Sequence, residues 1–465
     1  MQTRRASTFL AVLAFVAGAV NVAGAQGGLR VGAAKVDVTG PPGPSQTGKY
    51  DHEKVYVRAI VIDNGATRAA LVSVESGQFD WPTTLQGVAA ELACPVENII
   101  ISGTHTHSGS AAPSPRPGTS VPPAVASPPI LEAVRQARAR LQPASMGFGT
   151  GAAYLNVNRD AIHPETRKWT QYSNLDAPSD KTVAVLTFFR PTGEAIAVYV
   201  NYAMHPINGY VLGVVSGDYP GAMSRYVEKA FGDDVIVAFS QGASGDQNPL
   251  YLRPSNNAMA SRVNNTITGF EINREASEGP LRDAASKGPA AKNADPKVIE
   301  DLFRFIESEG QLLGEEVIRV MTWTKKATSD VRIMGLRKVV SCPGRKRTDG
   351  DPWDPRTREG VDATYEDAPP VGIQIGVLGI GTVALAPVTG EIYAQIGLRA
   401  KNESPLRNTV LVTPANGRLG GYVPDDASYG HQTFQVLNTI LKPGCAETAI
   451  VDTIADLEAQ YLAGR

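Results

Sequence analysis

Residues 99–109 have the sequence IIISGTHTHSG, in which an apolar run leads directly into two histidines. Three consecutive isoleucines are typical of a strand that is buried in a sheet. Because side chains alternate between the two faces of a strand, we expect His105 and His107 to project to the same side. Two imidazoles at a strand end suit a metal ligand beside a second catalytic group. In the alternative interpretation, one histidine belongs to the core and the other to a loop.

The composition is that of a globular protein with a large core. The 465 residues are 42% hydrophobic and 19% charged, with a formal net charge of -2. A chain of this length has room for two or three domains, although α/β enzymes of this size can form a single domain. The near-zero net charge offers no electrostatic case for binding nucleic acid or an anionic membrane. The oligomeric state stays open.

The N-terminus has the pattern of a secretory signal peptide. Arg4 and Arg5 precede an apolar stretch over residues 9–20, and small residues follow at 23–25. We expect a signal peptide at 1–25, a single domain at 26–465, and a secreted or periplasmic location. The alternative is an uncleaved membrane anchor, for which the apolar stretch is short.

The cysteines are Cys94, Cys342 and Cys445, so at most one intramolecular disulfide forms. Their wide spacing resembles no metal-binding motif. Cys342–Cys445 is one pairing that an oxidising compartment would allow, but the sequence leaves the pairing open.

The pattern of apolar residues predicts an α/β fold with mixed sheets flanked by helices and an active site at the strand ends. Strands are expected at 55–63, 69–75, 182–189, 195–202, 233–240 and 409–413, and in the apolar stretch 371–385. Helices are expected at 81–92, 130–141, 296–321, 392–400 and 446–462. Segments rich in proline or charge predict inserted surface loops at 111–129 and 343–370.

Polar side chains follow four of the predicted strands: His105 and His107, then His205, Glu391 and, after a short loop, Tyr422. Two histidines and one glutamate are sufficient for a catalytic zinc with an open position, and Tyr422 would be a fourth ligand or a proton donor. Each residue also has a plainer explanation. His205 would cap its strand, and Glu391 would sit at the favourable N-terminus of a helix.

Several motifs together resemble those of the neutral, non-lysosomal ceramidases, zinc amidases that cleave the fatty acyl amide of ceramide. The resemblance covers roughly residues 30 to 460. It rests on THTHSG at 104–109, Asn158-Arg159, AMHP at 203–206, Gly245-Asp246 with Asn248-Pro249, Gly390-Glu391, and Tyr422-Val423-Pro424.

The resemblance implies one zinc ion per chain, held by His105, His205, Glu391 and Tyr422. It also implies that His107 and Arg159 act near the substrate carbonyl or in the proton transfers. A permanently charged, forked donor such as Arg159 suits an oxyanion, although an ordinary surface ion pair is the alternative. Asp246 would orient a neighbouring donor or ligand.

The chain departs from the family pattern in three respects. Asn248 stands where the family has its motif serine, and Ser244 lies on the wrong side of that motif. Phe434 stands twelve positions after Tyr422, where the family has a second tyrosine. Tyr429 and His431 lie nearby and could compensate, with Asn248 or Tyr429 assisting Arg159 at the oxyanion. We also expect no C-terminal β-sandwich domain.

These patterns predict a secreted zinc-dependent amidase that hydrolyses the N-acyl amide bond of ceramide or a related N-acyl lipid by a metal-activated water. A lipid substrate would also allow peripheral contact with a membrane. The alternative is a non-catalytic or esterase-type zinc protein of the same superfamily. A zinc phosphoesterase ranks last, because the chain lacks the aspartate-rich ligand set of a two-metal site.

Overall fold

The computed structural model describes residues 28–39, 54–77, 82–108, 123–209, 214–232, 234–251, 296–324, 327–350, 357 and 359–464. The predicted signal peptide and most of the predicted loop at 111–129 lie outside the described residues.

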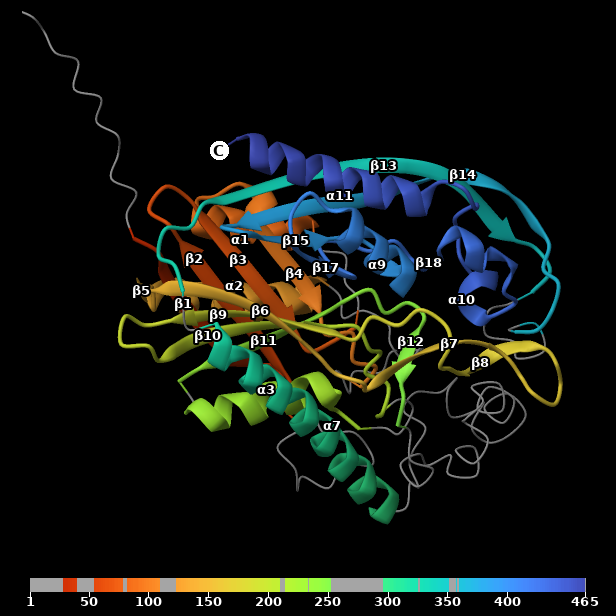
Figure 1. Ribbon diagram of the computed structural model, residues 1–465, viewed down its shortest axis with the longest axis horizontal. Coiled ribbons are helices and arrows are strands. Elements are labelled where there is room, and N and C mark those ends of the chain that lie inside the picture. Colours follow the sequence, from red (N-terminus) through yellow and green to blue (C-terminus); the bar gives the residue numbers. More distant parts are fainter. Residues whose placement is uncertain are drawn as a thin grey trace, which may run out of the picture.

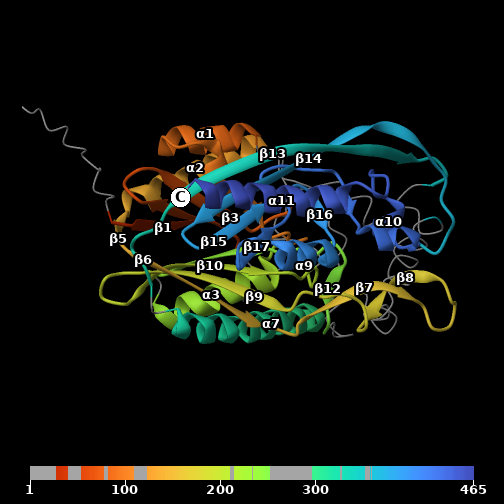
Figure 2. The same ribbon diagram turned by 45° about the horizontal axis from the view of Figure 1, so that its top comes forward.

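The first sheet carries the strand that precedes the two histidines. Its strands are β1 (Arg30–Asp37), β2 (Tyr56–Asp63), β3 (Arg68–Val74), β4 (Ile99–Gly103) and β5 (Gln142–Pro143). They lie in the order β4-β3-β2-β1-β5, with β3 and β4 parallel and the other pairs antiparallel. Asn64 and Gly65 turn β2 into β3 as predicted, and Gly65 has a φ of 83°. The helices α1 (Pro82–Leu92) and α2 (Pro123–Ala139) cover one face (Figure 2).

The second sheet carries the strand that precedes His205. Its strands are β6 (Ser145–Ala152), β9 (Thr182–Phe189), β10 (Ala195–Tyr202) and β11 (Ile236–Gln241). Their order is β11-β10-β9-β6, and β10 and β11 are parallel. The helices α3 (Asp218–Phe231) and α7 (Pro296–Trp323) cover its outer face, so the two sheets lie between helical layers (Figure 2). None of the described helices is long and apolar enough to span a membrane.

The third sheet is a long hairpin extended by two shorter strands. It contains β13 (Ile333–Arg347), β14 (Tyr365–Ile380), β15 (Val383–Pro387) and β17 (Asn408–Val412), in that order. The helices α9 (Ala394–Glu403) and α11 (Ala446–Ala463) pack against it (Figure 1). A disulfide joins Cys342 on β13 to Cys445 before α11 and leaves Cys94 free, so the geometry selects the pairing that the sequence left open.

Two small sheets extend the strand ends toward the same side of the molecule (Figure 2). One has the order β12-β7-β8, and the other pairs β16 with β18 in parallel. Their bounds are β7 (Asn156–Ile162), β8 (Trp169–Asn174), β12 (Gln247–Pro249), β16 (Glu391–Ile392) and β18 (Tyr422–Val423). The short helices η2 (Val96–Asn98), η4 (Asp426–Gly430) and α10 (Phe434–Leu437) complete the described elements.

Both predicted loops are shorter than expected. Residues 123–129 belong to α2, in which Pro128 and Pro129 precede an apolar face packed on the sheet. Residues 343–347 and 365–370 belong to β13 and β14. Pro343 is accommodated because the register shifts between Cys342 and Gly344, where the strand bulges. Charged residues are tolerated because this end of the hairpin is largely exposed.

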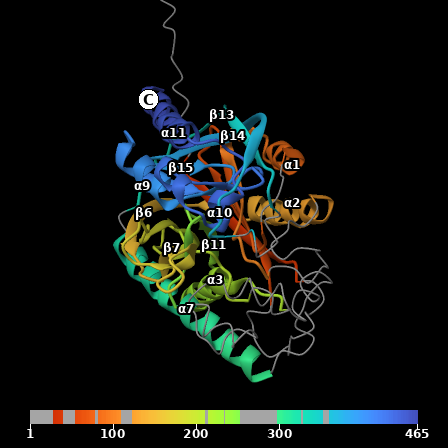
Figure 3. The same cartoon turned by 90° about the vertical axis from the view of Figure 1, so that its right-hand side faces the viewer.

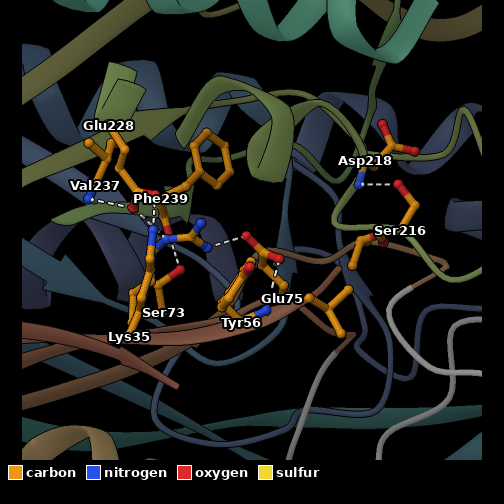
Figure 4. Close-up of polar contacts among 12 residues, drawn as sticks. Lys35, Tyr56, Ser73, Glu75, Ser216, Asp218, Glu228, Val237 and Phe239 are labelled. Carbon is orange, nitrogen blue, oxygen red and sulfur yellow. Dashed lines mark hydrogen bonds and ion pairs between the residues drawn. The ribbon is translucent and has the colours of Figure 1, made fainter. Parts of the chain in front are cut away.

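A buried ion network joins the first sheet to α3. Arg58 on β2 contacts Glu75 and donates from Nε to Glu228 Oε1 at 3.0 Å. Lys35 Nζ lies 2.7 Å from the other oxygen of Glu228, and Tyr56 N donates to Glu75 at 2.9 Å (Figure 4). Burial alone would raise the pKa of Glu228, but the charges of Arg58 and Lys35 hold that pKa below its usual value. The network therefore fixes the end of β3 against the neighbouring layer.

We expect Glu228→Gln to lower the free energy of unfolding by about 3 kcal/mol, because removing one partner leaves buried cations uncompensated. Urea unfolding followed by circular dichroism measures the change. Glu366→Gln, which breaks the exposed pair with Lys346, is the control and should cost less than about 1 kcal/mol. Equal losses in the two variants would contradict a special role for the network.

Candidate metal centre and active site

His105 lies beyond the end of β4, in a loop held by backbone hydrogen bonds. Its N–H donates to Ser76 O at 2.9 Å, and His107 N donates to Pro206 O at 3.2 Å. His105 has a φ of 69°, so the strand alternation expected for the two histidines is wrong. The loop still brings the two rings together, with centroids 5.2 Å apart and planes at 86°.

His205 follows β10 and is oriented by the backbone of β12. Its N–H donates to Gln247 O at 3.0 Å, and its ring Nδ1 lies 3.1 Å from the same oxygen. Because a carbonyl only accepts, Nδ1 carries the proton and Nε2 presents a lone pair. The second ring nitrogen of His205 is therefore available as a ligand atom.

Glu391 completes a triangle of ligand atoms. Its Oε2 lies 3.3 Å from His105 Nε2 and 3.2 Å from His205 Nε2, and these two nitrogens are 3.2 Å apart. Bonds of 2.0–2.1 Å to a tetrahedral zinc place neighbouring ligand atoms about 3.3 Å apart. The three side chains thus fit a metal ion of this size.

His107 is the alternative third ligand in this cluster. The ring nitrogens of His105, His107 and His205 lie within 4.8 Å of one another, which is a looser arrangement than the triangle with Glu391. Burial and the neighbouring imidazoles hold the pKa of His107 well below its usual value. Burial, with a contribution from Arg159, lowers the pKa of His205 to about 4. Both rings are therefore neutral near pH 7, as metal binding or proton acceptance requires.

Tyr422 reaches the site through the pairing of β16 and β18, which sets it opposite Glu391. Its ring lies 5.5 Å from the Arg159 guanidinium and makes an edge contact with Phe434 at 5.8 Å. The structure thus brings Tyr422 beside the triangle, and its role as fourth ligand stays a prediction.

Arg159 is buried on β7 and held from two sides. Its Nη1 donates to Asn248 Oδ1 at 3.0 Å and its Nη2 to Gly245 O at 2.6 Å. The alternative of a surface ion pair is wrong, because Arg159 is only 5% exposed. Arg159 Nε is buried and finds no hydrogen-bond partner among the described residues. One charged donor is therefore left over in the site.

Asp246 bridges β7 and the start of α9. Its Oδ2 accepts from Asn158 Nδ2 at 2.6 Å, and its Oδ1 accepts from Ala394 N at 2.8 Å. Burial, together with the nearby charge of Asp160, raises the pKa of Asp246 to about 7. Ala394 lies three residues after Glu391. The Asp246 carboxyl group therefore connects β7, which carries Arg159, to the segment that carries Glu391.

The structure does not support the predicted role of Tyr429. Its hydroxyl donates to Lys442 O at 3.4 Å, and its ring faces the Arg345 guanidinium at 5.1 Å. Burial raises the pKa of this hydroxyl to about 12. Tyr429 therefore packs against Arg345 and Lys442.

Sequence reasoning missed two kinds of participant. The first is the pair of Asp160 and Tyr393, which make a buried hydrogen bond of 2.9 Å. The three consecutive polar residues at 158–160 were a signal that could have drawn attention to Asp160 as well as Arg159. The carbonyl of Gln247 had no signal at all, because every residue has one.

Residues 29–346 match the family described as neutral/alkaline non-lysosomal ceramidase, N-terminal. Neutral ceramidase B of Dictyostelium discoideum is 26% identical, with 88% of this chain and 68% of that protein covered. Neutral ceramidase of Drosophila melanogaster is 22% identical, and this chain spans about half of its length (54%, with 78% of this chain covered). The crystal structure of neutral ceramidase from Pseudomonas aeruginosa has a similar fold, with a TM-score of 0.67 at 18% identity, covering 94% of this chain and 75% of that one.

We expect Gly245→Ala to lower the affinity for zinc by about 10-fold or more, because substitutions that displace the support of a metal ligand have effects of this size. A methyl group at this position would lie 2.5 Å from Glu391 O and would displace β16. Equilibrium dialysis against zinc measures the affinity. Gly430→Ala is the control, because no atom lies within 4 Å of its added methyl group. A folded Gly245→Ala variant with unchanged zinc affinity would contradict the prediction.

Proposed function

Because this chain belongs to the neutral/alkaline non-lysosomal ceramidase family, we propose that it is a zinc-dependent amidase that hydrolyses the N-acyl amide bond of ceramide or a related N-acyl lipid. The observation that carries the proposal is the triangle of His105, His205 and Glu391 ligand atoms, with edges of 3.2–3.3 Å. The proposal includes a signal peptide at 1–25 and action in the periplasm or outside the cell.

One zinc ion would be held by His105, His205 and Glu391, with Tyr422 as the fourth ligand. When bound, zinc polarises a carbonyl group and lowers the pKa of water to about 7. The neutral imidazoles and the ionised carboxylate suit such a cation. Burial alone would raise the pKa of Glu391, but His105 and His205 hold that pKa well below its usual value.

Arg159 supplies charge stabilisation for the amide oxygen. Gly245 and Asn248 each hold one terminal nitrogen, and the Nε–H has no partner among the described residues, so this N–H is a donor available to the oxygen that becomes negative. A preorganised donor of this kind contributes about 10²–10³ to turnover. Asn248 therefore orients the guanidinium, and the reaction needs no nucleophile at the position of the family serine.

His107 moves the proton. Its half-buried, neutral imidazole lies 5.2 Å from the His105 ring and 5.9 Å from the His205 ring, measured between centroids. It accepts a proton from the attacking water and delivers it to the leaving amine. Asp246 takes no part in this transfer and holds Asn158 and Ala394, which align Arg159 and Glu391.

We expect the purified protein to release fatty acid from a fluorescent medium-chain ceramide, to lose this activity with a zinc chelator, and to regain it when zinc is added. Fatty acid release is followed by chromatography. A zinc-loaded protein that releases nothing from ceramide would contradict the ceramide assignment. Testing other N-acyl lipids and esters would then separate an amidase or esterase of different specificity from a non-catalytic zinc protein.

We expect His107→Ala to reduce turnover by about 10²–10⁴ while zinc content stays near one per chain, because proton transfer is lost and the ligand set is kept. His105→Ala should lose both zinc and activity. Zinc is measured by elemental analysis and turnover on the same samples. Equal loss of zinc in the two variants would identify His107 as a ligand instead.

A further inference from the structure

A second imidazole–carboxylate pair lies beside β7, the strand that carries Arg159. His431, between η4 and α10, has its Nδ1 at 3.2 Å from Asp160 Oδ2. The same oxygen accepts from Tyr393 OH at 2.9 Å, and Asp160 is 2% exposed. The His431 ring also stacks on Trp169 of β8, with centroids 4.0 Å apart and planes at 23°. The imidazole is therefore fixed in position and in the plane of its ring.

The residues of this pair and its partners are close in sequence to residues of the proposed site. Asp160 follows Arg159 on β7, and Tyr393 comes two residues after Glu391. The loop that carries His431 leads within three residues to Phe434, whose ring contacts Tyr422. In Figure 3, β7 and α10 lie at the end of the molecule that faces the viewer. His431 thus lies beside the segments that carry Arg159, Glu391 and Tyr422.

The contact with Asp160 determines the hydrogen-bonding character of Nε2, the other ring nitrogen of His431. A carboxylate accepts, so Nδ1 of the neutral ring carries the proton and Nε2 carries a lone pair. The His431 side chain is 27% exposed, in contrast to the buried Asp160. The ring therefore presents an oriented hydrogen-bond acceptor on a surface that also carries an indole. This acceptor suits a polar group of a substrate and is unsuited to an alkyl chain.

We propose that His431 determines specificity in the amidase site by accepting a hydrogen bond at Nε2 from a hydroxyl group on the amine half of the N-acyl substrate. This inference rests on the proposed function. Phe434 has no hydroxyl group, and His431 is a polar side chain of the same stretch that a carboxylate and an indole hold in place. No covalent bond forms or breaks at His431.

The test compares two substrates with the same acyl chain. One is an N-acylated amino alcohol, and the other is the N-acylated alkylamine that lacks the hydroxyl group. We expect the wild-type protein to prefer the amino alcohol by about tenfold in kcat/KM, mainly through KM, because a group built to bind a hydroxyl is left unpaired by the analogue. His431→Ala should remove this preference and keep the hydrolysis of the alkylamine substrate.

Conservative variants separate recognition from a structural role. The amide of His431→Gln reaches the position of Nε2 and should restore part of the preference, whereas His431→Asn reaches only Asp160 and should not. The matched control is His163→Ala, on the β7–β8 hairpin that carries Asp160 and Trp169, where Nδ1 accepts from the backbone of Glu165 and Thr166. This control should keep the wild-type preference and the wild-type melting temperature.

The outcomes distinguish the two proposals. If wild type and His431→Ala hydrolyse both substrates with the same preference, the role of His431 is overturned and the proposed function stands. If His431→Asn restores the preference as well as His431→Gln does, His431 acts only through Asp160, and substrate contact is overturned. If the zinc-loaded wild type hydrolyses neither substrate, the proposed function is overturned and this inference with it.

Discussion

The site depends on the hydrogen bonds made by one short stretch of backbone, the Gly245–Gln247 segment. Its first N–H donates to Ile392 O at 2.8 Å, which positions the strand of Glu391. Its last carbonyl accepts from both the backbone and the ring of His205. Its other carbonyls accept from Arg159, through the guanidinium and through the main-chain N–H. Two of the predicted ligands, His205 and Glu391, and the charged donor Arg159 are thus held by the same three residues.

Such an arrangement suits a site that must hold lone pairs close together. Three acceptor atoms at 3.2–3.3 Å repel one another unless a cation or a shared proton lies between them. The surrounding backbone must therefore resist their separation. On the other side, the network around Arg58 secures the end of β3, from which Ser76 holds His105. Buried polar groups that hydrogen-bond to one another provide the stiffness on both sides.

The departures from the family pattern acquire a consistent physical meaning in this framework. Asn248 accepts from Arg159 and so orients the guanidinium. Phe434 packs against Tyr422, while His431 in the neighbouring loop contacts the carboxylate of Asp160. Tyr429, the other nearby polar residue, is held by Lys442 and Arg345.

The sequence by itself determined the strands, the main helices and three of the grouped side chains, because apolar periodicity marks buried elements and His105, His205 and Glu391 stand where such elements end. It misjudged the strand alternation at His105 and His107 and the lengths of both predicted loops, since local rules cannot register a left-handed residue, a bulge or a helix that packs on a sheet. Only the tertiary structure decided the pairing of Cys342 with Cys445, the orientation of His205 by a carbonyl, and the contact between Asp160 and His431. The reason is physical: these interactions join segments far apart in the chain, or use backbone groups that every residue has, so no local pattern encodes them.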